Sequence, residues 1–361
     1  MSRTVLVTGG AGFIGSAVVR HLLAATGHRV VTLDALTYAG HLASLEGVLD
    51  DPRHTFVHAD VTDAAAVADA FRTHAPDAVL HLAAESHVDR SIDGPAAFLR
   101  TNVDGTFTLL EAARAAWTTD HGMRDDVRFV HVSTDEVFGS LAPDAPAFHE
   151  GTPYAPRSPY AASKAASDHL ARAWFHTYGL PVIVTNCSNN YGPRQFPEKL
   201  LPTIVLRGAR GASLPIYGAG DQVRDWLYVD DHARGLVAAL ERGTPGATYL
   251  FGGRNERRNL EVVQQVCRLL DDAHPDGAPH ANRIEHVPDR PGHDVRYAVD
   301  PTRAETDLGW RPTVAFEEGL RTTVDWYRTH PAWVDAVRGG YDLERQGLGP
   351  QAGPETGRGT P

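Results

Sequence analysis

Lysine is almost absent from this chain. Of its 34 lysine and arginine residues only Lys164 and Lys199 are lysines, so the other 32 are arginines. A lysine ammonium is a compact point charge whose pKa shifts readily on burial, whereas the planar arginine guanidinium stays charged. Because the chain otherwise uses arginine, we expect each lysine to lie where a point charge has a chemical task.

Cysteine and net positive charge are scarce too. Cys187 and Cys267 are the only cysteines and lie far apart in the sequence. This argues against a disulfide framework or a cysteine-based zinc site, and it favours a reducing cytoplasm. The net charge of −11 argues against a nucleic-acid-binding surface, which needs clustered positive charge. We therefore expect a cytoplasmic protein with no metal site and no nucleic-acid partner.

Long apolar runs are also missing. No stretch approaches the roughly 18 apolar residues of a membrane span. The first apolar run, Thr4 to Thr8, is broken at once by Gly9-Gly10, so it does not form a signal-peptide core. With 42% hydrophobic residues the chain can still build a sizeable core. It is expected to be soluble and to make no membrane contact.

Short apolar runs alternate with segments of helical period through the first half of the chain. The strands are predicted at 4–8, 29–33, 54–58, 78–82, 127–132 and 181–185. The helices are predicted at 12–25, 63–74, 95–117 and 159–179. This alternation predicts an α/β fold with a doubly wound parallel Rossmann sheet of six or seven strands and helices on both faces.

The second half of the chain differs in composition, because prolines and glycines lie between shorter helical stretches. Helices are predicted there at 198–209, 230–242, 260–273 and 316–330. We expect a second, smaller α/β substrate domain. The predicted division is 1–192 for the dinucleotide-binding domain, 193–335 for the interleaved second domain, a return of about 223–242 to the first domain, and a disordered tail at 339–361.

Gly9, Gly12 and Gly15 follow the first strand and open the first helix at a spacing of three and three. Such a turn lets the backbone approach a pyrophosphate, whose charge suits the helix N-terminus. A tight strand-to-helix turn is the simpler explanation, but Asp34 ends the second strand 19 residues after Gly15. That is close to the ~20 expected of the carboxylate that binds an adenosine ribose. The pattern predicts dinucleotide binding, and because Asp34 would repel a 2′-phosphate it favours NAD over NADP.

Tyr160 and Lys164 lie at i and i+4 on a helix that opens with Ser158 as its N-cap and Pro159 in its first turn. A nearby ammonium stabilises a phenolate, so the spacing predicts a lowered pKa for Tyr160. A surface pair on an amphipathic helix is the alternative. The glycine turn and the scarcity of lysine favour the catalytic interpretation.

With these residues the chain resembles the extended short-chain dehydrogenase/reductase family from residue 4 to about 335. Ser133-Thr134-Asp135-Glu136-Val137-Phe138-Gly139 then places two carboxylates at the end of a central strand. Together with Ala84 to Ser91 and Ser188 to Pro193, this motif is similar to that of the dTDP-glucose 4,6-dehydratase family. Phe138 stands where tyrosine is usual in that family, and His41 where asparagine is usual.

The resemblance implies a reaction. Oxidation of hexose C4 by bound NAD makes the C5 proton acidic, so a base and an acid can eliminate water before hydride returns to C6. Adjacent carboxylates raise one pKa and can hold opposite protonation states. By resemblance, Tyr160 accepts the C4 hydroxyl proton and Thr134 bonds the same oxygen. Glu136 removes the C5 proton, and Asp135 protonates the leaving hydroxyl.

The same resemblance implies the binding residues. For NAD these are Gly9, Gly12, Phe13, Ile14, Gly15, Asp34, Ala35, Leu36, Thr37, Asp60, Val61, Leu82, Ala83, Ala84, Ser86, Thr101, Tyr160, Lys164 and Asn190. For the nucleotide sugar they are Ser86, Thr134, Asn189, Lys199, Leu200, Pro215, Tyr217, Arg224, Asn259, Arg290, His293 and Tyr297.

Three alternatives stay open. A 4-epimerase or a decarboxylase of the same family would not need the acid/base pair. A UDP-sugar 4,6-dehydratase would differ only in its nucleotide. A non-catalytic NAD-sensing protein would be expected to lack Tyr160, Lys164 or Glu136, all of which are present. The resemblance also implies a homodimer, for which helix 95–117 is a candidate interface, although its apolar pattern equally suits burial against the sheet.

Overall fold

A seven-stranded parallel sheet forms the centre of the computed structural model, which describes residues 2–339 and 343. Its strand order is β12 (Thr248–Phe251), β8 (Val182–Cys187), β7 (Arg128–Thr134), β4 (Ala78–His81), β1 (Thr4–Thr8), β2 (Arg29–Asp34) and β3 (His54–His58). The six strands predicted from the sequence all occur here, and the predicted α/β fold is confirmed.

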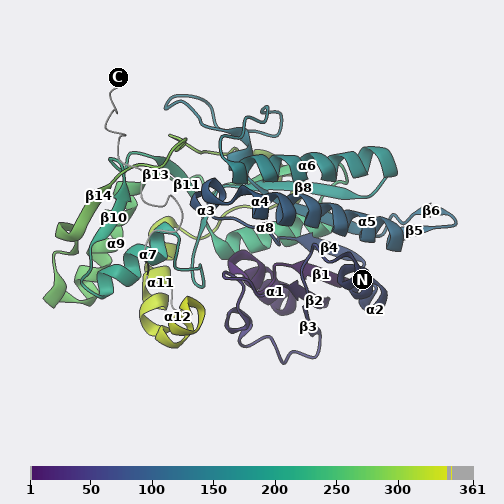
Figure 1. The fold of residues 1–361 in the computed structure, drawn as a ribbon, viewed down its shortest axis with the longest axis horizontal. Coiled ribbons are helices and arrows are strands. Elements are labelled where there is room, and N and C mark those ends of the chain that lie inside the picture. The colour runs from purple at the N-terminus through teal and green to yellow at the C-terminus, as the bar shows by residue number, and fades with distance from the viewer. Residues whose placement is uncertain (1, 340–342, 344–361) are drawn as a thin grey trace, which may run out of the picture.

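Helices cover both faces of this sheet (Figure 1). One face packs against α1 (Phe13–Ala25) and α8 (Val229–Arg242), and the other against α2 (Ala64–His74), α5 (Gly105–Trp117) and α6 (Pro159–Tyr178). The alternation of strand side chains explains the two cores, because Val5 and Val7 point to the first face while Leu6 points to the second.

Side chains cap two helix N-termini, one of which is the Ser158 cap predicted from the sequence. The Asp63 carboxylate accepts hydrogen bonds from the backbone N–H groups of Ala65 and Ala66, each at 3.0 Å, and so caps α2. The Ser158 hydroxyl accepts one from Ala161 N at 3.1 Å and caps α6. These caps satisfy N–H groups that have no partner within the helix. The cap of α6 sets the start of the helix that carries Tyr160 and Lys164.

The helix predicted at 95–117 is interrupted. It consists of α4 (Pro95–Phe98), a π-helical segment η2 (Leu99–Asp104) and α5. Asn102 in the wide turn donates to Glu85 O at 3.0 Å and to Ser163 Oγ at 2.8 Å. The π-helical turn therefore ties this helix to the loop after β4 and to α6. Such turns are frequent at functional sites.

A second unit lies on the left in Figure 1. It contains α7 (Leu200–Ala209), α9 (Asn259–Ala273), α11 (Phe316–Thr329), α12 (Pro331–Arg338), and the parallel pair β10 (Leu214–Tyr217) and β14 (Ile284–Val287). Its own core includes Ile204, Val263, Phe316 and Leu320. The remaining elements are α3 (Val88–Asp93), α10 (Thr302–Leu308), β5 (Thr118–Thr119), β6 (Gly122–Met123) and the short helices η1 (Leu42–Leu45), η3 (Asp135–Phe138), η4 (Pro275–Gly277) and η5 (His280–Arg283).

The segment 223–242, expected to return to the first domain, divides between two places. Helix α8 packs against α1 and the central sheet. The strand before it, β11 (Val223–Tyr228), instead pairs with β9 (Asn189–Tyr191) and β13 (Glu256–Arg258) in a separate three-stranded sheet. The seventh strand of the central sheet is β12, which the sequence did not predict. Parallel pairing with β8 places β12 there.

Within the described residues no helix is long and apolar enough to cross a membrane. The same part of the chain contains no group of His, Cys, Asp and Glu side chains arranged to hold a metal ion. The tail predicted to be disordered, 339–361, lies outside the described residues apart from positions 339 and 343.

Candidate active site

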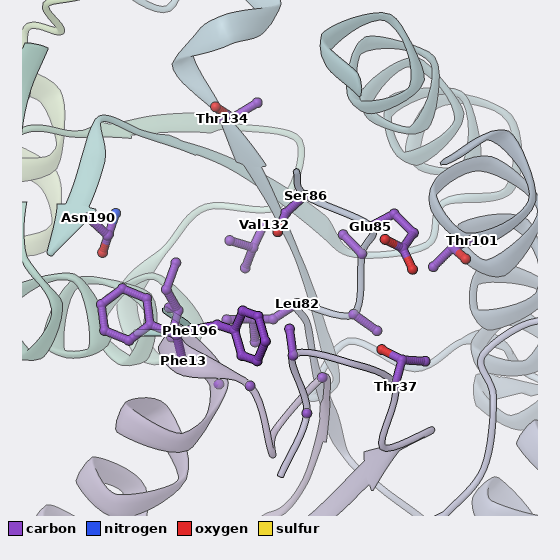
Figure 2. A pocket seen from close by; sticks show the side chains of 18 of the residues that line it. Phe13, Thr37, Leu82, Glu85, Ser86, Thr101, Val132, Thr134, Asn190 and Phe196 are labelled. Atoms are coloured by element: carbon purple, nitrogen blue, oxygen red, sulfur yellow. The ribbon is translucent and has the colours of Figure 1, made fainter. Parts of the chain in front are cut away.

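A cavity opens at the carboxyl edge of the central sheet, where the strand order reverses between β1 and β4. Ligands of parallel α/β sheets bind at this switch point. Figure 2 shows the cavity walls, which come from distant segments: Phe13 from the start of α1, Leu82 and Val132 from strand ends, and Asn190 and Phe196 from the region after β8.

The glycine turn forms one end of the cavity. Gly9 has φ +68°, and a Cβ there would lie 2.7 Å from the backbone N of Ala83. A Cβ on Gly15 would lie 2.0 Å from the carbonyl oxygen of Gly9. Gly12 is the N-cap of α1, and no side chain caps that helix. The exposed helix N-terminus and the close backbone packing suit a pyrophosphate.

Asp34 lies at the end of β2, beside this turn. Its carboxylate accepts hydrogen bonds from Ala11 N at 2.9 Å and from Leu36 N at 2.8 Å. Burial raises the pKa of Asp34 against the opposing effect of these two bonds. The side chain is thus held rigidly in the cavity wall, where its remaining lone pairs can accept from a ribose hydroxyl.

The two adjacent carboxylates lie directly after β7, in η3. The Thr134 hydroxyl caps this short helix by accepting a bond from Glu136 N at 3.2 Å, and it donates to Asp135 Oδ1 at 3.3 Å. Burial, with the Glu136 charge as the next cause, raises the pKa of Asp135 well above its usual value. Burial also raises the pKa of Glu136, but the charges of Arg290, Arg224 and Lys199 oppose that shift. Of the two carboxyl groups, Asp135 therefore has the stronger tendency to hold a proton.

Tyr160 differs from the sequence-based prediction. The i, i+4 spacing predicts that Lys164 lowers the pKa of Tyr160, but that pKa is raised well above 10. Burial is the largest cause and the Glu136 charge the next, and these outweigh the hydrogen bond with Thr134. The Lys164 ammonium is itself engaged, donating to Val132 O at 2.8 Å. The prediction neglected the desolvation of the phenol.

The loop 195–199 brings the second lysine to the cavity. Lys199 Nζ donates to Ser86 O at 3.0 Å and lies 4.0 Å from Glu198 Oε1. Glu198 is buried, with its Oε2 3.5 Å from Arg90 Nε. Arg90 in turn lies over the Tyr38 ring at 3.7 Å. These contacts join the loops after β2, β4 and β9 over the cavity.

Several residues predicted to bind the nucleotide do not line the cavity, and acidic side chains hold four of them, Tyr217, Arg290, His293 and Tyr297. Tyr217 Oη donates to Asp89 at 2.6 Å, and Arg290 lies 3.4 Å from the same carboxylate. Arg224 donates to the carbonyl oxygen of Asp294 at 2.9 Å. The others in this group are Leu200, Pro215, Asn259, His293 and Tyr297.

All five residues predicted to be catalytic line the cavity, as do Asn189, Lys199 and Ser86. Of the predicted NAD residues only Leu36 does not line it, since its side chain packs against the core below α1. Glu85, Phe196 and Glu198 were not predicted as site residues although they line it. Glu85 belongs to a motif that carried the family resemblance, but nothing local in the sequence showed that Glu85, Phe196 or Glu198 faces the cavity.

Unsatisfied polar atoms mark the same place. Within the described residues, buried Ser133 Oγ, Ser188 Oγ, Asn189 Oδ1 and Asp135 Oδ2 have no hydrogen-bond partner. Buried polar groups are normally bonded, so these atoms suit a polar ligand. The residues thus fit a dinucleotide beside a polyhydroxylated substrate.

Comparison with known proteins identifies the family. A family model described as GDP-mannose 4,6 dehydratase matches residues 6–323. The dTDP-glucose 4,6-dehydratase 1 of Escherichia coli K12 is 56% identical over 345 residues, covering 93% of this chain and 96% of the relative. The dTDP-glucose 4,6-dehydratase of Xanthomonas campestris pv. campestris B100 is 56% identical over 351 residues, covering 95% and 99%.

Solved structures agree. DesIV, a dTDP-glucose 4,6-dehydratase from Streptomyces venezuelae crystallised with NAD, has a TM-score of 0.85 and 47% identity, covering 92% of this chain and 99% of that one. The UDP-glucose 4-epimerase of Thermus thermophilus, also with NAD, has a TM-score of 0.80 and 32% identity, covering 91% and 99%. The chain therefore belongs to the nucleotide-sugar dehydratase family that the model describes, and within it to the dTDP-glucose 4,6-dehydratases of the extended short-chain dehydrogenase/reductases.

Proposed function

We propose that this chain is an NAD-dependent hydro-lyase that converts dTDP-glucose to dTDP-4-keto-6-deoxyglucose. One observation carries the proposal. Asp135 and Glu136 follow β7 directly and share one cavity with Tyr160, Lys164 and the glycine turn. Relatives that are 53–56% identical over nearly the whole chain bear the name of this activity.

The side chains act on different atoms of the hexose. NAD, when bound, would supply the hydride chemistry, acceptance from C4 and return to C6, so that the reaction has no net redox change. Tyr160 accepts the C4 hydroxyl proton, the Thr134 hydroxyl holds that oxygen, and the Lys164 ammonium stabilises the phenolate as it forms. The residues proposed to bind NAD are Gly9 to Gly15, Asp34 to Thr37, Asp60-Val61 and Leu82 to Ala84 at the strand ends, and Ser86, Thr101 and Asn190.

The acid and the base are assigned by their surroundings. Glu136 removes the C5 proton and gives a proton, exchangeable with solvent, back to C5 when hydride reaches C6. The cations Arg290, Arg224 and Lys199 favour its ionised form against the burial that raises its pKa. Asp135 is the proposed acid, because burial and the Glu136 charge raise its pKa well above the usual value and so favour its protonated form. Its proton leaves with the C6 hydroxyl as water. A neutral acid beside an ionised base is the arrangement that elimination requires.

The nucleotide end is proposed to lie against the second unit. Lys199 and Arg290 supply positive charge for the diphosphate in a chain of net charge −11. The other proposed contacts are Ser86, Thr134, Asn189, Leu200, Pro215, Tyr217, Arg224, Asn259, His293 and Tyr297. Parallel assays with dTDP-glucose and UDP-glucose measure which of the two nucleotides the enzyme prefers.

Epimerase activity is the competing function, since UDP-glucose 4-epimerases share the fold at 31–32% identity. Epimerisation needs no acid/base pair at C5 and C6. The raised pKa of Asp135 therefore favours the dehydratase, which needs a proton donor at C6. The dTDP-glucose 4,6-dehydratase structures are more similar to this chain, at 40–47% identity.

Glu136→Gln tests the mechanism. In wild-type enzyme we expect a 4-keto product, detected by its absorbance in alkali, and solvent deuterium at C5. The variant should still oxidise C4, so enzyme-bound NADH should accumulate while product and C5 deuterium fall by about 10²-fold or more. Glu285→Gln on the exposed surface of β14 is the matched control. Unchanged turnover in Glu136→Gln would refute this base.

We also propose a homodimer formed through η2, α5 and α6. Apolar side chains are exposed on these elements: Leu99 is 54% exposed, Phe107 48% and Tyr178 45%. Trp174 lies between the last two, with ring centroids 5.8 Å from Phe107 and 5.4 Å from Tyr178. Phe107→Glu should give a monomer by light scattering, whereas Leu49→Glu at another exposed apolar site should not.

The proposed location is the cytoplasm. Cys187 and Cys267 are both buried and free, which suits a reducing compartment. Fractionation of the native host would test this location.

A further inference from the structure

Asp168 is a buried carboxylate to which the proposed reaction gives no task. It lies one turn after Lys164 on α6 and is 0% exposed. His131 Nε2 lies 3.0 Å from its Oδ1, Tyr154 Oη donates to its Oδ2 at 2.7 Å, and Asn186 Nδ2 lies 3.4 Å away. A carboxylate is buried this completely only when donors or a positive charge compensate it.

Lys164 is a buried cation close to this buried carboxylate on the same helix. Its side chain is buried, and its ammonium donates to a neutral group, the carbonyl oxygen of Val132, at 2.8 Å. A carbonyl satisfies one N–H of the ammonium but does not neutralise its charge. An ammonium in such a place loses its proton readily unless an anion lies near it.

The surroundings of Lys164 contain several titratable groups. Some interact with its charge and others line the same cavity. They are Tyr160 and Asp168 on α6, His131 on β7, His81 on β4, Cys187 on β8, and Asp135 and Glu136 on η3. On two other helices packed on α6, the carboxylates are engaged elsewhere: Asp89 of α3 contacts Tyr217 and Arg290, and Glu111 of α5 contacts Arg114 and Trp174. Asp93 on α3 and Arg100 and Asp104 on η2 are further charged residues of elements packed on α6.

Two of these groups carry a negative charge in the proposed mechanism, Glu136 and Asp168, and of the two Asp168 has the larger effect on the pKa of Lys164. Burial lowers the pKa of both His81 and His131 and raises the pKa of the Cys187 thiol, so all three are neutral. Burial works to raise the pKa of Asp168, but the bond with His131 and the nearby positive charge more than offset it, and the net direction is down.

The effect on Lys164 is direct. Burial lowers the pKa of Lys164, and the Asp168 charge is the largest opposing cause. No ion pair of 4.0 Å or less joins the two side chains in the described structure, so the carboxylate acts through its charge across the interior. Such an interaction is strong where water is excluded.

We propose that Asp168 is a positioning residue of the active site, whose carboxylate, oriented by His131 and Tyr154, is the counter-charge that keeps Lys164 an ammonium. This inference rests on the proposed role of Lys164. The titration of Lys164 can nevertheless be measured whatever substrate the enzyme uses.

The scarcity of lysine makes that titration simple to observe. Protein labelled with ¹³C at lysine Cε gives two side-chain signals, from Lys164 and Lys199, and Lys164→Arg assigns them. In Asp168→Asn we expect the titration midpoint of Lys164 to fall by about one pH unit or more, with Lys199 unchanged. The alkaline limb of kcat/KM should move down by a similar amount.

Tyr154→Phe is the matched control, because it removes one hydrogen bond to Asp168 but leaves the charge in place. Its Lys164 midpoint should stay close to that of the wild type. An unchanged Lys164 midpoint in Asp168→Asn would overturn the proposal. An equal shift in Tyr154→Phe would also overturn it, since the hydrogen-bond geometry and not the charge would then be responsible.

If Asp168→Asn folds poorly, a double-mutant cycle of melting temperatures tests the proposed counter-charge. Removing the carboxylate alone leaves Lys164 uncompensated, so replacing both partners in Lys164→Met/Asp168→Asn should restore much of the melting temperature lost in Asp168→Asn. If the double variant is no more stable than Asp168→Asn, the carboxylate serves only His131, Tyr154 and Asn186, and the proposed counter-charge is wrong.

Discussion

We expect Lys164→Arg to lower kcat/KM by about 10- to 100-fold while Lys199→Arg costs only a few-fold. The first replacement puts a planar guanidinium where the Lys164 ammonium, 4% exposed, donates to Val132 O at 2.8 Å. A hydrogen bond that involves a charged group contributes about 1.5–3 kcal/mol, and this range corresponds to the stated loss. The larger group also crowds a packed interior.

Lys199 has a different environment. Its side chain is 35% exposed, it donates to Ser86 O at 3.0 Å, and it lies 4.0 Å from Glu198. A guanidinium can reach the same carbonyl and still present positive charge to a diphosphate. The proposed task of Lys199 needs a cation and no shift in its pKa, so arginine is an adequate substitute.

Steady-state kinetics with dTDP-glucose would measure both effects, and thermal melts would separate loss of folding from loss of activity. Lys164→Arg should reduce kcat with little change in KM, whereas Lys199→Arg should act mainly on KM. The reasoning fails if Lys164→Arg keeps activity within a few-fold of wild type, or if the two variants are equally impaired.

Three further outcomes are expected. Gly15→Ala should abolish NAD binding in a fluorescence titration, since its Cβ would lie 2.0 Å from the Gly9 carbonyl oxygen, whereas Gly27→Ala has nothing within 4 Å and should bind normally. Asp135→Asn should raise the melting temperature more at about pH 8 than at about pH 5. The pKa of Asp135 is higher in the folded than in the unfolded chain, so the wild type loses stability as the pH rises above the pKa of the unfolded chain. A melting-temperature difference between variant and wild type that is the same at both pH values would contradict this. Glu198→Gln should weaken the contact with Arg90 and increase NAD loss during gel filtration, and full retention would exclude that role.

The site could be predicted from sequence where its geometry is local. Gly9 to Gly15 form a turn within one chain segment, Asp34 ends the next strand, and Tyr160 and Lys164 share a helix face because four residues complete a turn. The cavity at the carboxyl edge of the sheet follows from parallel strands. These features depend on residues close in sequence, and the structure brings them together as predicted.

Other features depend on segments far apart in sequence. Strand β12 reads as a short apolar run, and only pairing with β8 makes it part of the central sheet. The π-helical turn at η2 is set by contacts of Asn102 with the loop after β4 and with α6. Glu198 lines the cavity because its loop folds back to Arg90.

The sequence by itself predicted the fold class and the dinucleotide turn from a periodicity and a spacing of a few residues, and it indicated the proposed reacting side chains through a family resemblance. Only the tertiary structure decided the directions in which their pKa values shift. The raised pKa of Tyr160, the raised pKa of Asp135 and the lowered pKa of Asp168 come from desolvation and from hydrogen bonds and charges on separate strands and helices. Such effects sum over everything that surrounds a group, and that sum exists only once the chain has folded.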